Sequence, residues 1–218
     1  MTCQTMEEQR LPRKEVGVYR LGIMGGTFDP IHYGHLVTAE GARSAFGLDQ
    51  VLFLPSGRPP HKKMDKVTDP EHRYMMTVLA TLTNPHFEVS RLEIDRTGVS
   101  YTIDTLRILR DQYGSETELF FITGADAIFD IMSWKDSDEY LTIAHFVAAS
   151  RPGFCLADLP QSTRQWMEQH RDRFHVLQVP AMAISSTDIR ERVHSGCSIR
   201  YLVPESVEHY ILRQGLYV

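Results

Sequence analysis

Short apolar runs recur along the chain and alternate with longer segments of mixed polarity. Each run is bounded by polar or turn residues and is short enough for a buried β-strand, whereas most intervening segments have the length of a helix. The first run, YRLGIM, occupies residues 19–24. The expected strands that follow it are 51–55, 86–94, 118–123, 145–150 and 174–179.

Two of the intervening segments carry recognisable helix ends. Asp69 followed by Pro70 supplies an N-cap and a proline at the first helical position, and Asn84-Pro85 is expected to end that helix. In the segment TIDTLRILRDQY, apolar residues at helical spacing precede Gly114, which stands where a left-handed residue is favoured. Those apolar residues are Ile103, Leu106, Leu109 and Tyr113.

The alternation predicts an α/β fold with a doubly wound parallel sheet and helices on both faces, because parallel neighbours need a crossover connection. No internal repeat or interdomain linker interrupts the pattern. We therefore expect residues 18–218 to form a single domain that ends in short helices, preceded by a polar extension over residues 1–17. Open sheets of this kind bind ligands beyond the carboxyl ends of their strands, so the turns after strands are the places to search.

The composition narrows the class of partner. Of the 218 residues, 23 are Lys or Arg and 28 are Asp or Glu; the formal net charge of −5 argues against a nucleic-acid partner and an anionic membrane surface. No stretch reaches the roughly 18 apolar residues of a membrane span. The N-terminal residues mix both charge signs and lack the apolar core of a secretion signal, so a cytoplasmic protein is the expectation.

Three cysteines, Cys3, Cys155 and Cys197, occur without paired spacing. An odd, scattered set argues against a disulfide framework and against a thiolate zinc site. We expect these cysteines to be small packing residues.

The turn after the first strand contains adjacent glycines and two histidines. Gly25 and Gly26 let backbone amides approach a ligand closely. His32 and His35 are three residues apart where a helix is expected to begin, so both rings can face a ligand at that terminus. A helix N-terminus favours anions and imidazole adds donors, so the turn predicts a phosphate site. Neither the dinucleotide fingerprint nor a P-loop fits this sequence.

Two other interpretations of these histidines stay open at this point. They could be ordinary polar surface residues, or they could bind a metal ion together with Asp29 in a metal-dependent hydrolase. The glycine pair in front of them favours the anion site over both alternatives.

A second expected helix start, near the C-terminus, also carries polar groups that suit a phosphate. Ser185, Ser186 and Thr187 follow the last expected strand, and hydroxyls at such a place usually act as N-caps. Thr187 and Arg190 are three residues apart, which places a hydroxyl and a guanidinium on one helix face. Arginine binds phosphate oxygens through two parallel N–H groups, which lysine cannot do. The two helix starts together predict a polyphosphate held at both ends.

Two segments carry a resemblance to a known family: GGTFDPIHYGH (25–35) and ISSTDIR (184–190). Together they resemble the nucleotidyltransferase superfamily that has an H-x-G-H signature, and more closely its nicotinate-nucleotide adenylyltransferase branch. Phosphopantetheine adenylyltransferases typically have T-x-G-H instead. The resemblance covers residues 20–218, with further matches at PPHKK (59–63), SYTIDTL (100–106), ITGADAIFDIMSWKD (122–136), RPG (151–153) and YLVPESVEHYILRQGLY (201–217).

The resemblance implies a Rossmann-like nucleotidyltransferase fold and roles for particular residues of this chain. It implies that His32, His35 and Arg190 are catalytic. It also implies that Lys62 and Thr102 contact the mononucleotide and that Trp134 covers its pyridine ring. The implied ATP-binding residues are Gly25, Gly26, Thr27, Phe28, His32, His35, Asp126, Ser186, Thr187 and Arg190, with Asp126 on a ribose hydroxyl.

Some of these residues also have a plain structural interpretation. Lys62 lies in a basic loop that could simply be solvated, and Asp126 could cap a helix. Trp134 could be an ordinary core aromatic, and Trp166 is expected to be a core or surface residue.

The activity implied by the resemblance is adenylyl transfer from ATP to nicotinate mononucleotide, giving deamido-NAD and pyrophosphate. Both reactants are anions, so neutralisation and alignment are the main tasks and no protein nucleophile is needed. Magnesium carried by ATP is the implied cofactor, with no metal ligand from a protein side chain. The competing functions are adenylyl transfer to nicotinamide mononucleotide or phosphopantetheine, and a non-catalytic nucleotide-binding module on the same fold.

Overall fold

The computed structural model describes residues 17–59, 67–125, 128, 134–150, 159–180 and 183–218. These residues form a six-stranded sheet in the order β3-β2-β1-β4-β5-β6, and every neighbouring pair is parallel. The strands are β1 (Arg20–Gly26), β2 (Gln50–Pro55), β3 (Phe87–Val89), β4 (Glu118–Gly124), β5 (His145–Ser150) and β6 (Phe174–Gln178).

The strand order reverses between β1 and β4. From β1 the chain adds β2 and β3 on one side, then returns to the other edge of β1 with β4 and continues outward to β6. Gly22 of β1 is accordingly in register with Val51 on one side and with Phe120 on the other. Ligands of open parallel sheets bind at such a reversal, so the residues that follow β1 and β4 are placed for a site.

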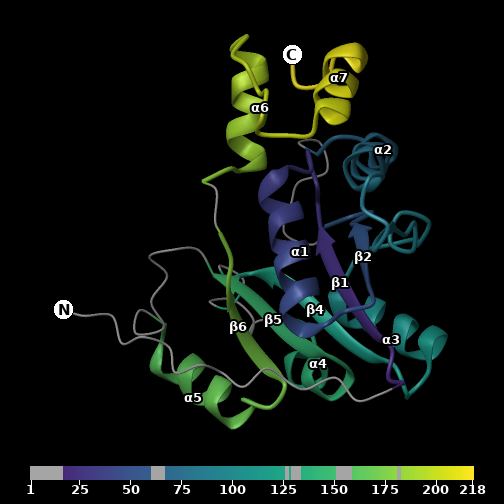
Figure 1. The fold of residues 1–218 in the computed structure, drawn as a ribbon, viewed down its shortest axis with the longest axis vertical. Helices are drawn as coiled ribbons and strands as arrows, with labels where there is room; N and C mark the ends of the chain where they lie inside the picture. Colours follow the sequence, from purple (N-terminus) through teal and green to yellow (C-terminus); the bar gives the residue numbers. More distant parts are fainter. Residues whose placement is uncertain (1–16, 60–66, 126–127, 129–133, 151–158, 181–182) are drawn as a thin grey trace.

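Helices cover both faces of the sheet (Figure 1). Their bounds are α1 (Tyr33–Phe46), α2 (Pro70–Thr81), α3 (Thr102–Tyr113), α4 (Ser137–Ile143), α5 (Gln161–Gln169), α6 (Ser186–His194) and α7 (Glu205–Gln214). One hydrophobic core joins α1, α2, α6 and α7 to the sheet, and a second joins α3, α4 and α5. Alternation along β4 supplies both cores, because Phe120 and Ile122 face the first and Leu119 and Phe121 face the second.

The predicted α/β class, with its doubly wound parallel sheet, is confirmed, and several local signals act as expected. β5 spans the predicted residues 145–150, while β1 extends past Met24 through Gly25 and Gly26. α2 begins at Pro70, and the Asp69 carboxylate accepts a hydrogen bond from the Glu71 N–H at 2.8 Å. The predicted N-cap at Asp69 is therefore confirmed.

Three local expectations need correction. The strand expected over 86–94 ends at Val89, because the Ser90 hydroxyl accepts a hydrogen bond from the Leu92 N–H at 3.1 Å and turns the chain. α2 ends at Thr81, before Asn84-Pro85, since its last residues pass into a turn in which the Asn84 N–H donates to the Thr81 carbonyl at 3.0 Å. Gly114 has the expected positive φ of 76°, but its ψ of 171° is extended rather than left-handed helical.

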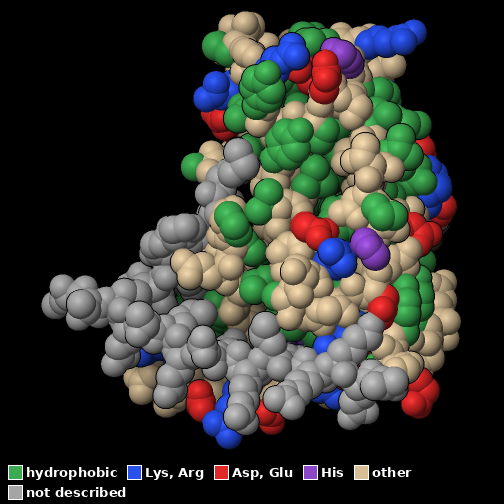
Figure 2. Space-filling model, in the orientation of Figure 1, with side chains coloured by type: hydrophobic (Ala, Val, Ile, Leu, Met, Phe, Trp, Pro, Cys, Tyr) green, Lys and Arg blue, Asp and Glu red, His purple; other side chains and the backbone are tan. Residues whose placement is uncertain are grey.

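The surface differs from expectation at one cysteine. Cys197 is exposed in the turn after α6, so the expectation that it packs inside is wrong; Cys3 and Cys155 lie outside the described residues. Within the described ranges, no helix combines the length and the apolar character that a membrane span requires. Figure 2 shows acidic and basic side chains interspersed on one face of the molecule.

Candidate functional site

Two cavities open at the carboxyl ends of the strands, on opposite faces of the sheet. The larger, about 520 Å³, lies beside the start of α3 and is named the α3 cavity. The smaller, about 280 Å³, is lined by both histidines of the first turn and is named the histidine cavity. Leu106 and Phe121 from one core line the α3 cavity, whereas Met24 and Ile184 from the other core line the histidine cavity. The sheet therefore separates the α3 cavity from the histidine cavity.

The turn after β1 borders the α3 cavity with backbone and short side chains. Gly25, Gly26 and Thr27 line the α3 cavity. A Cβ on Gly26 would lie 2.7 Å from the Phe28 ring, so a side chain here would displace that ring. Phe28 is buried with a φ of 50°, and its ring meets the His35 ring edge-on at 5.1 Å between centroids. The turn is therefore packed directly against one of the histidines.

His32 and His35 lie at the N-terminus of α1, as their spacing predicts. His32 is the N-cap, and the two rings stack with centroids 3.8 Å apart beside the histidine cavity. The His32 backbone N–H donates to His35 Nδ1 at 3.2 Å. Because that N–H can only donate, a neutral His35 ring carries its proton on Nε2. Gly34 permits this stack, since a Cβ there would lie 2.9 Å from His32 Nδ1.

The N-terminus of α6 is hydrogen-bonded to the loop between β1 and α1. Ser185 is the N-cap, and its Oγ accepts from the Asp188 N–H at 3.1 Å. Ser186 Oγ donates to the Pro30 carbonyl at 2.9 Å. Ser185 and Ser186 also line the histidine cavity together with His32. The N-termini of α1 and α6 thus converge on one cavity.

Arg190 lies beside the same loop, on the same side of the molecule as His32. Its NH2 group donates to Thr187 Oγ1 at 3.2 Å, so these two side chains share a helix face as their spacing predicts. Its NH1 group donates to the Asp29 carbonyl at 2.7 Å. The structure therefore brings the guanidinium and the imidazoles to neighbouring positions around one loop.

Thr102 and Trp134 meet in the α3 cavity. Thr102 is the first residue of α3, where backbone N–H groups have no partner within the helix. Trp134 is partly buried and packs edge-on against Phe121 and Tyr140, with ring centroids 6.3 Å and 5.7 Å away. Burial raises the pKa of Tyr140 to about 12, so its hydroxyl remains a protonated donor. The cavity thus combines a helix N-terminus with an aromatic wall.

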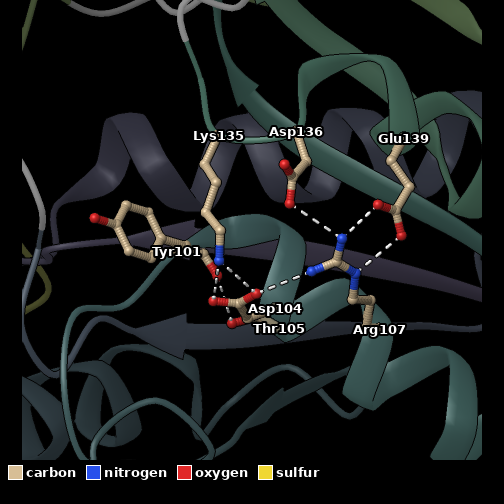
Figure 3. Close-up of polar contacts among 7 residues, drawn as sticks. All are labelled: Tyr101, Asp104, Thr105, Arg107, Lys135, Asp136 and Glu139. Carbon is tan, nitrogen blue, oxygen red and sulfur yellow. Dashed lines mark hydrogen bonds and ion pairs between the residues drawn. The ribbon is translucent and has the colours of Figure 1, made fainter.

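A network of ion pairs at the α3 cavity connects α3 to the turn that follows Trp134 (Figure 3). Lys135 Nζ lies 3.1 Å from Asp104 Oδ1 and 4.9 Å from the centre of the Tyr101 ring. Arg107 pairs with Asp104 at 3.2 Å and with Asp136 at 3.1 Å, and it also pairs with Glu139. Asp104 therefore joins the two cations, and Arg107 also holds the carboxylates of Asp136 and Glu139 on the segment that follows Trp134.

Two buried charged residues, Glu93 and Arg73, support the α3 cavity and the turn after β1, and the sequence pattern does not indicate either role. Glu93 lines the α3 cavity and accepts a hydrogen bond from Thr105 Oγ1 at 2.6 Å, and burial raises the pKa of its carboxyl group. Arg73 of α2 is fully buried and donates to the carbonyls of Thr68 at 2.8 Å and Thr27 at 2.8 Å. Periodicity would assign Glu93 to a strand surface and Arg73 to a solvated helix face, so only the tertiary contacts identify them.

The remaining predicted residues divide into two groups. Lys62 and Asp126 lie outside the described residues. Asp29 is described, and its carboxylate accepts from Tyr217 and from Thr68 instead of joining the histidines. In the described part of the chain no three His, Cys, Asp or Glu side chains form a possible metal site. The structure therefore does not bring the Asp29 carboxylate together with the two histidines.

Comparison with known proteins identifies relatives over most of the chain. The family described as cytidylyltransferase-like matches residues 23–192. A Moorella thermoacetica protein is 62% identical over 198 residues, which cover 91% of each chain. A Thermoanaerobacter protein is 57% identical over 198 residues, covering 91% of this chain and 94% of the relative. Both carry the name "Probable nicotinate-nucleotide adenylyltransferase".

Solved structures with the same fold are more distant in sequence. The Plasmodium falciparum nicotinic acid mononucleotide adenylyltransferase complexed with NaAD has a TM-score of 0.75 at 19% identity, covering 91% of this chain and 97% of the other. The same enzyme complexed with APC has a TM-score of 0.73 over the same shares. At this identity the likeness establishes the fold.

Proposed function

The chain belongs to the cytidylyltransferase-like family and, within it, to the nicotinate-nucleotide adenylyltransferases, and we propose from this membership how its two cavities serve the reaction. The enzyme transfers the adenylyl group of ATP to nicotinate mononucleotide and releases pyrophosphate, which is a step of NAD biosynthesis. We assign ATP to the histidine cavity and the mononucleotide to the α3 cavity.

The assignment of ATP depends on the convergence of α1 and α6. Two helix N-termini beside one cavity supply N–H groups and positive dipole ends for an anion. His32 and His35 lie at one of them, and Ser186, Thr187 and Arg190 lie at the other. An extended triphosphate can therefore contact both ends at once. This convergence is the observation that carries the proposal.

The assignment of the mononucleotide depends on the chemistry of the α3 cavity. Trp134 offers a flat aromatic face for the pyridine ring, and the amino end of α3 at Thr102 favours an anionic group. The resemblance adds Lys62 as a further cation for this ligand, and it adds Asp126 as a partner for a ribose hydroxyl of ATP. The volume of about 520 Å³ lies within the range of small-molecule sites.

The reaction needs the two anions to meet beyond the carboxyl ends of the strands, beside Gly25, Gly26 and Thr27. A phosphate oxygen of the mononucleotide forms a bond to the α-phosphorus of ATP, and the bond to the bridging oxygen breaks as pyrophosphate leaves with the electron pair. Two like charges 4 Å apart repel by about 4 kcal/mol at an effective dielectric constant near 20. We propose that His35 and His32 stabilise the charge on the α-phosphate and that Arg190 stabilises the oxygens of the departing pyrophosphate.

We propose that magnesium reaches the site bound to ATP, because Mg²⁺ commonly keeps several water ligands and binds substrate phosphates instead of a full protein cage. The ion supplies neutralisation of the phosphate charge. The protein itself then aligns the two substrates, through the turn after β1 and the two helix N-termini.

The proposal extends to the organisation of the chain. We propose that residues 18–218 act as one nucleotidyltransferase domain, because β1 and β4, which are neighbours in the one sheet, border both cavities. The net charge of −5 favours small anionic substrates held by local donors over a nucleic-acid partner. We place the reaction in the cytoplasm, where ATP is available to biosynthetic enzymes.

A substrate comparison tests this proposal. Pyrophosphate release is measured with ATP and, in parallel, nicotinate mononucleotide, nicotinamide mononucleotide or phosphopantetheine. We expect the highest kcat/KM with nicotinate mononucleotide. A higher value with either other acceptor would assign the chain to that reaction, and release from none of them would favour a non-catalytic nucleotide-binding module.

A further inference from the structure

The Asp29 carboxylate, in the loop between β1 and α1, is held by the far end of the chain. Asp29 is 2% exposed. Its Oδ1 accepts from the Tyr217 hydroxyl at 2.8 Å, and its Oδ2 accepts from the Thr68 N–H at 3.3 Å. Tyr217 is the penultimate residue of the sequence, 188 positions beyond Asp29. The loop that carries the histidines thus depends on a residue at the C-terminus.

The main chain of Asp29 makes the second connection. Its carbonyl accepts from Arg190 NH1 at 2.7 Å, while Arg190 NH2 donates to Thr187 Oγ1 at 3.2 Å. A guanidinium has five N–H groups, so these bonds orient it and leave further donors for a phosphate. Asp29 therefore connects the two residues. Its carboxylate accepts from the Tyr217 hydroxyl, and its carbonyl accepts from Arg190 and orients the guanidinium.

We propose that Tyr217 is a positioning residue for ATP, which acts through Asp29 to orient the Arg190 guanidinium toward the triphosphate. The inference rests on the proposed function, in which Arg190 binds that triphosphate. Tyr217 itself does not contact substrate in this account. Tyr217 therefore supports the ATP site without lining it.

The end of α7 has the backbone geometry that brings Tyr217 to this place. Gly215 adopts the left-handed conformation at the helix end, and the Leu216 N–H donates back to the Ile211 carbonyl at 3.1 Å. Tyr217 then has a φ of 68°, which is uncommon for a bulky residue. Such a conformation persists where surrounding contacts hold it, and the bond to Asp29 is such a contact.

The charges around Asp29 are consistent with a positioning role. The buried Arg73 and the partly buried Arg190 both act on this loop, and Arg73 donates to the Thr27 carbonyl at 2.8 Å. Burial, followed by the negative charge of Asp29, raises the pKa of Tyr217, so its hydroxyl stays a neutral donor. Tyr217 thus holds Asp29 without adding charge, while Arg73 and Arg190 donate to the Thr27 and Asp29 carbonyls of the same loop.

The first test removes the Tyr217 hydroxyl and keeps the ring. For Tyr217→Phe we expect the dissociation constant of magnesium-ATP, measured by calorimetry, to rise about tenfold. The KM for nicotinate mononucleotide should stay within about twofold of its wild-type value. The matched control is Tyr210→Phe on α7, which removes a hydroxyl paired with His72 Nδ1 at 2.9 Å and should leave both values unchanged.

A double-mutant cycle tests the route through Arg190. If Tyr217 acts through Arg190, adding Tyr217→Phe to Arg190→Ala should weaken ATP binding no further. An additional tenfold loss in that background would overturn the inference. So would equal losses for both substrates together with a lowered Tm, because that pattern indicates general destabilisation.

The cycle also separates this inference from the function on which it rests. Unchanged ATP binding by Arg190→Ala would reject the proposed role of Arg190, and the inference with it. Weakened binding by Arg190→Ala together with unchanged binding by Tyr217→Phe would reject the role of Tyr217 alone.

Discussion

Gly34 shows how a single missing side chain shapes the site. A Cβ at this position would lie 2.9 Å from His32 Nδ1, closer than real contacts allow, and 3.0 Å from His32 Cε1, which is also tight. The His32 ring could occupy its place beside His35 only if it moved. The glycine between the two histidines of H-x-G-H thus permits the stacked rings, and it has no helix-ending role because it lies inside the first turn of α1.

We expect Gly34→Ala to separate stability from activity. Alanine favours a helix over glycine by about 1 kcal/mol, so the Tm should stay equal or rise. The displaced His32 ring should lower kcat about 10- to 100-fold, since small misplacements at a reacting centre are costly. Thermal unfolding and steady-state kinetics on the same preparation check this. Wild-type turnover would show that the ring position is not needed.

His35 offers a more direct test of the proposed chemistry. Its Nδ1 accepts the His32 N–H, so the ring presents Nε2 with its proton as the donor for a phosphate oxygen. We expect His35→Ala to lower kcat by a factor on the order of 10² to 10³. The side chain is partly exposed, so the free energy of unfolding should change little. Unchanged turnover would remove His35 from the catalytic residues.

The residues that could be predicted from the sequence are those whose partners are close along the chain. The shared face of His32 and His35, and that of Thr187 and Arg190, follow from a spacing of three in a helix. Asp29 could not be placed in this way, because its carboxylate partner Tyr217 lies at the other end of the chain.

At the scale of elements, α3 and the turn before α4 form one functional unit. Arg107 contacts Asp136 and Glu139 on the turn and helix that follow Trp134, while Asp104 contacts both Arg107 and Lys135. Isolated surface ion pairs contribute little to stability, but a network can fix the relative position of two segments. Here the segment so fixed carries the aromatic wall of the α3 cavity.

We therefore expect Arg107→Ala to weaken mononucleotide use selectively. The KM for nicotinate mononucleotide should rise about fivefold, while the KM for ATP should not change. Steady-state kinetics with each substrate varied in turn measures both constants. An equal rise in both would contradict a local role at the α3 cavity.

Arg91→Ala is the matched control for this variant. Arg91 also pairs with two carboxylates, Glu71 at 2.7 Å and Asp95 at 2.9 Å, and its side chain is 38% exposed against 40% for Arg107. It lines neither cavity. Its removal should leave both KM values unchanged, so any shared loss would indicate a general effect of removing a surface cation.

The sequence predicted elements well where local chemistry determines their ends and poorly where tertiary contacts do. Asp69 and Pro70 set the start of α2 through groups within two residues of each other. The length of β3 instead depends on how much of residues 86–94 finds a place on β2, and only Phe87–Val89 pairs there. Alternating polarity cannot distinguish a strand from an extended segment that leaves the sheet.

At the scale of the whole molecule, the parallel topology places all the chemistry at one end of the sheet. The two cavities lie at the carboxyl ends of the strands, whereas the amino ends of β5 and β6 contain a buried histidine pair. His145 Nδ1 and His175 Nε2 lie 3.0 Å apart, so one ring donates and the other accepts. The order of the strands, which brings these two histidines together, has no local signal in the sequence.

This histidine pair should make the stability of the protein depend on pH. Burial, then the positive charge of Arg173, lowers the pKa of His145 to about 3 and that of His175 to about 4. In the unfolded chain both titrate near 6.5. Below that pH the unfolded chain binds protons that the folded protein excludes, so stability is lost as pH falls from about 6.5 toward the folded values. Each histidine contributes a slope of up to about 1.4 kcal/mol per pH unit.

We expect the double variant His145→Gln/His175→Gln to lose most of this slope between pH 6.5 and 4.5. Glutamine keeps a donor and an acceptor in the pair but does not titrate, so the free energy of unfolding should become nearly flat over that window. Urea unfolding at a series of pH values measures it. His209→Gln, on the exposed face of α7, is the control and should keep the wild-type slope. Equal slopes in wild type and double variant would show that other groups set the acid sensitivity, such as the paired Glu40 and Glu139, whose pKa values are lowered, and the buried Glu93, whose pKa is raised.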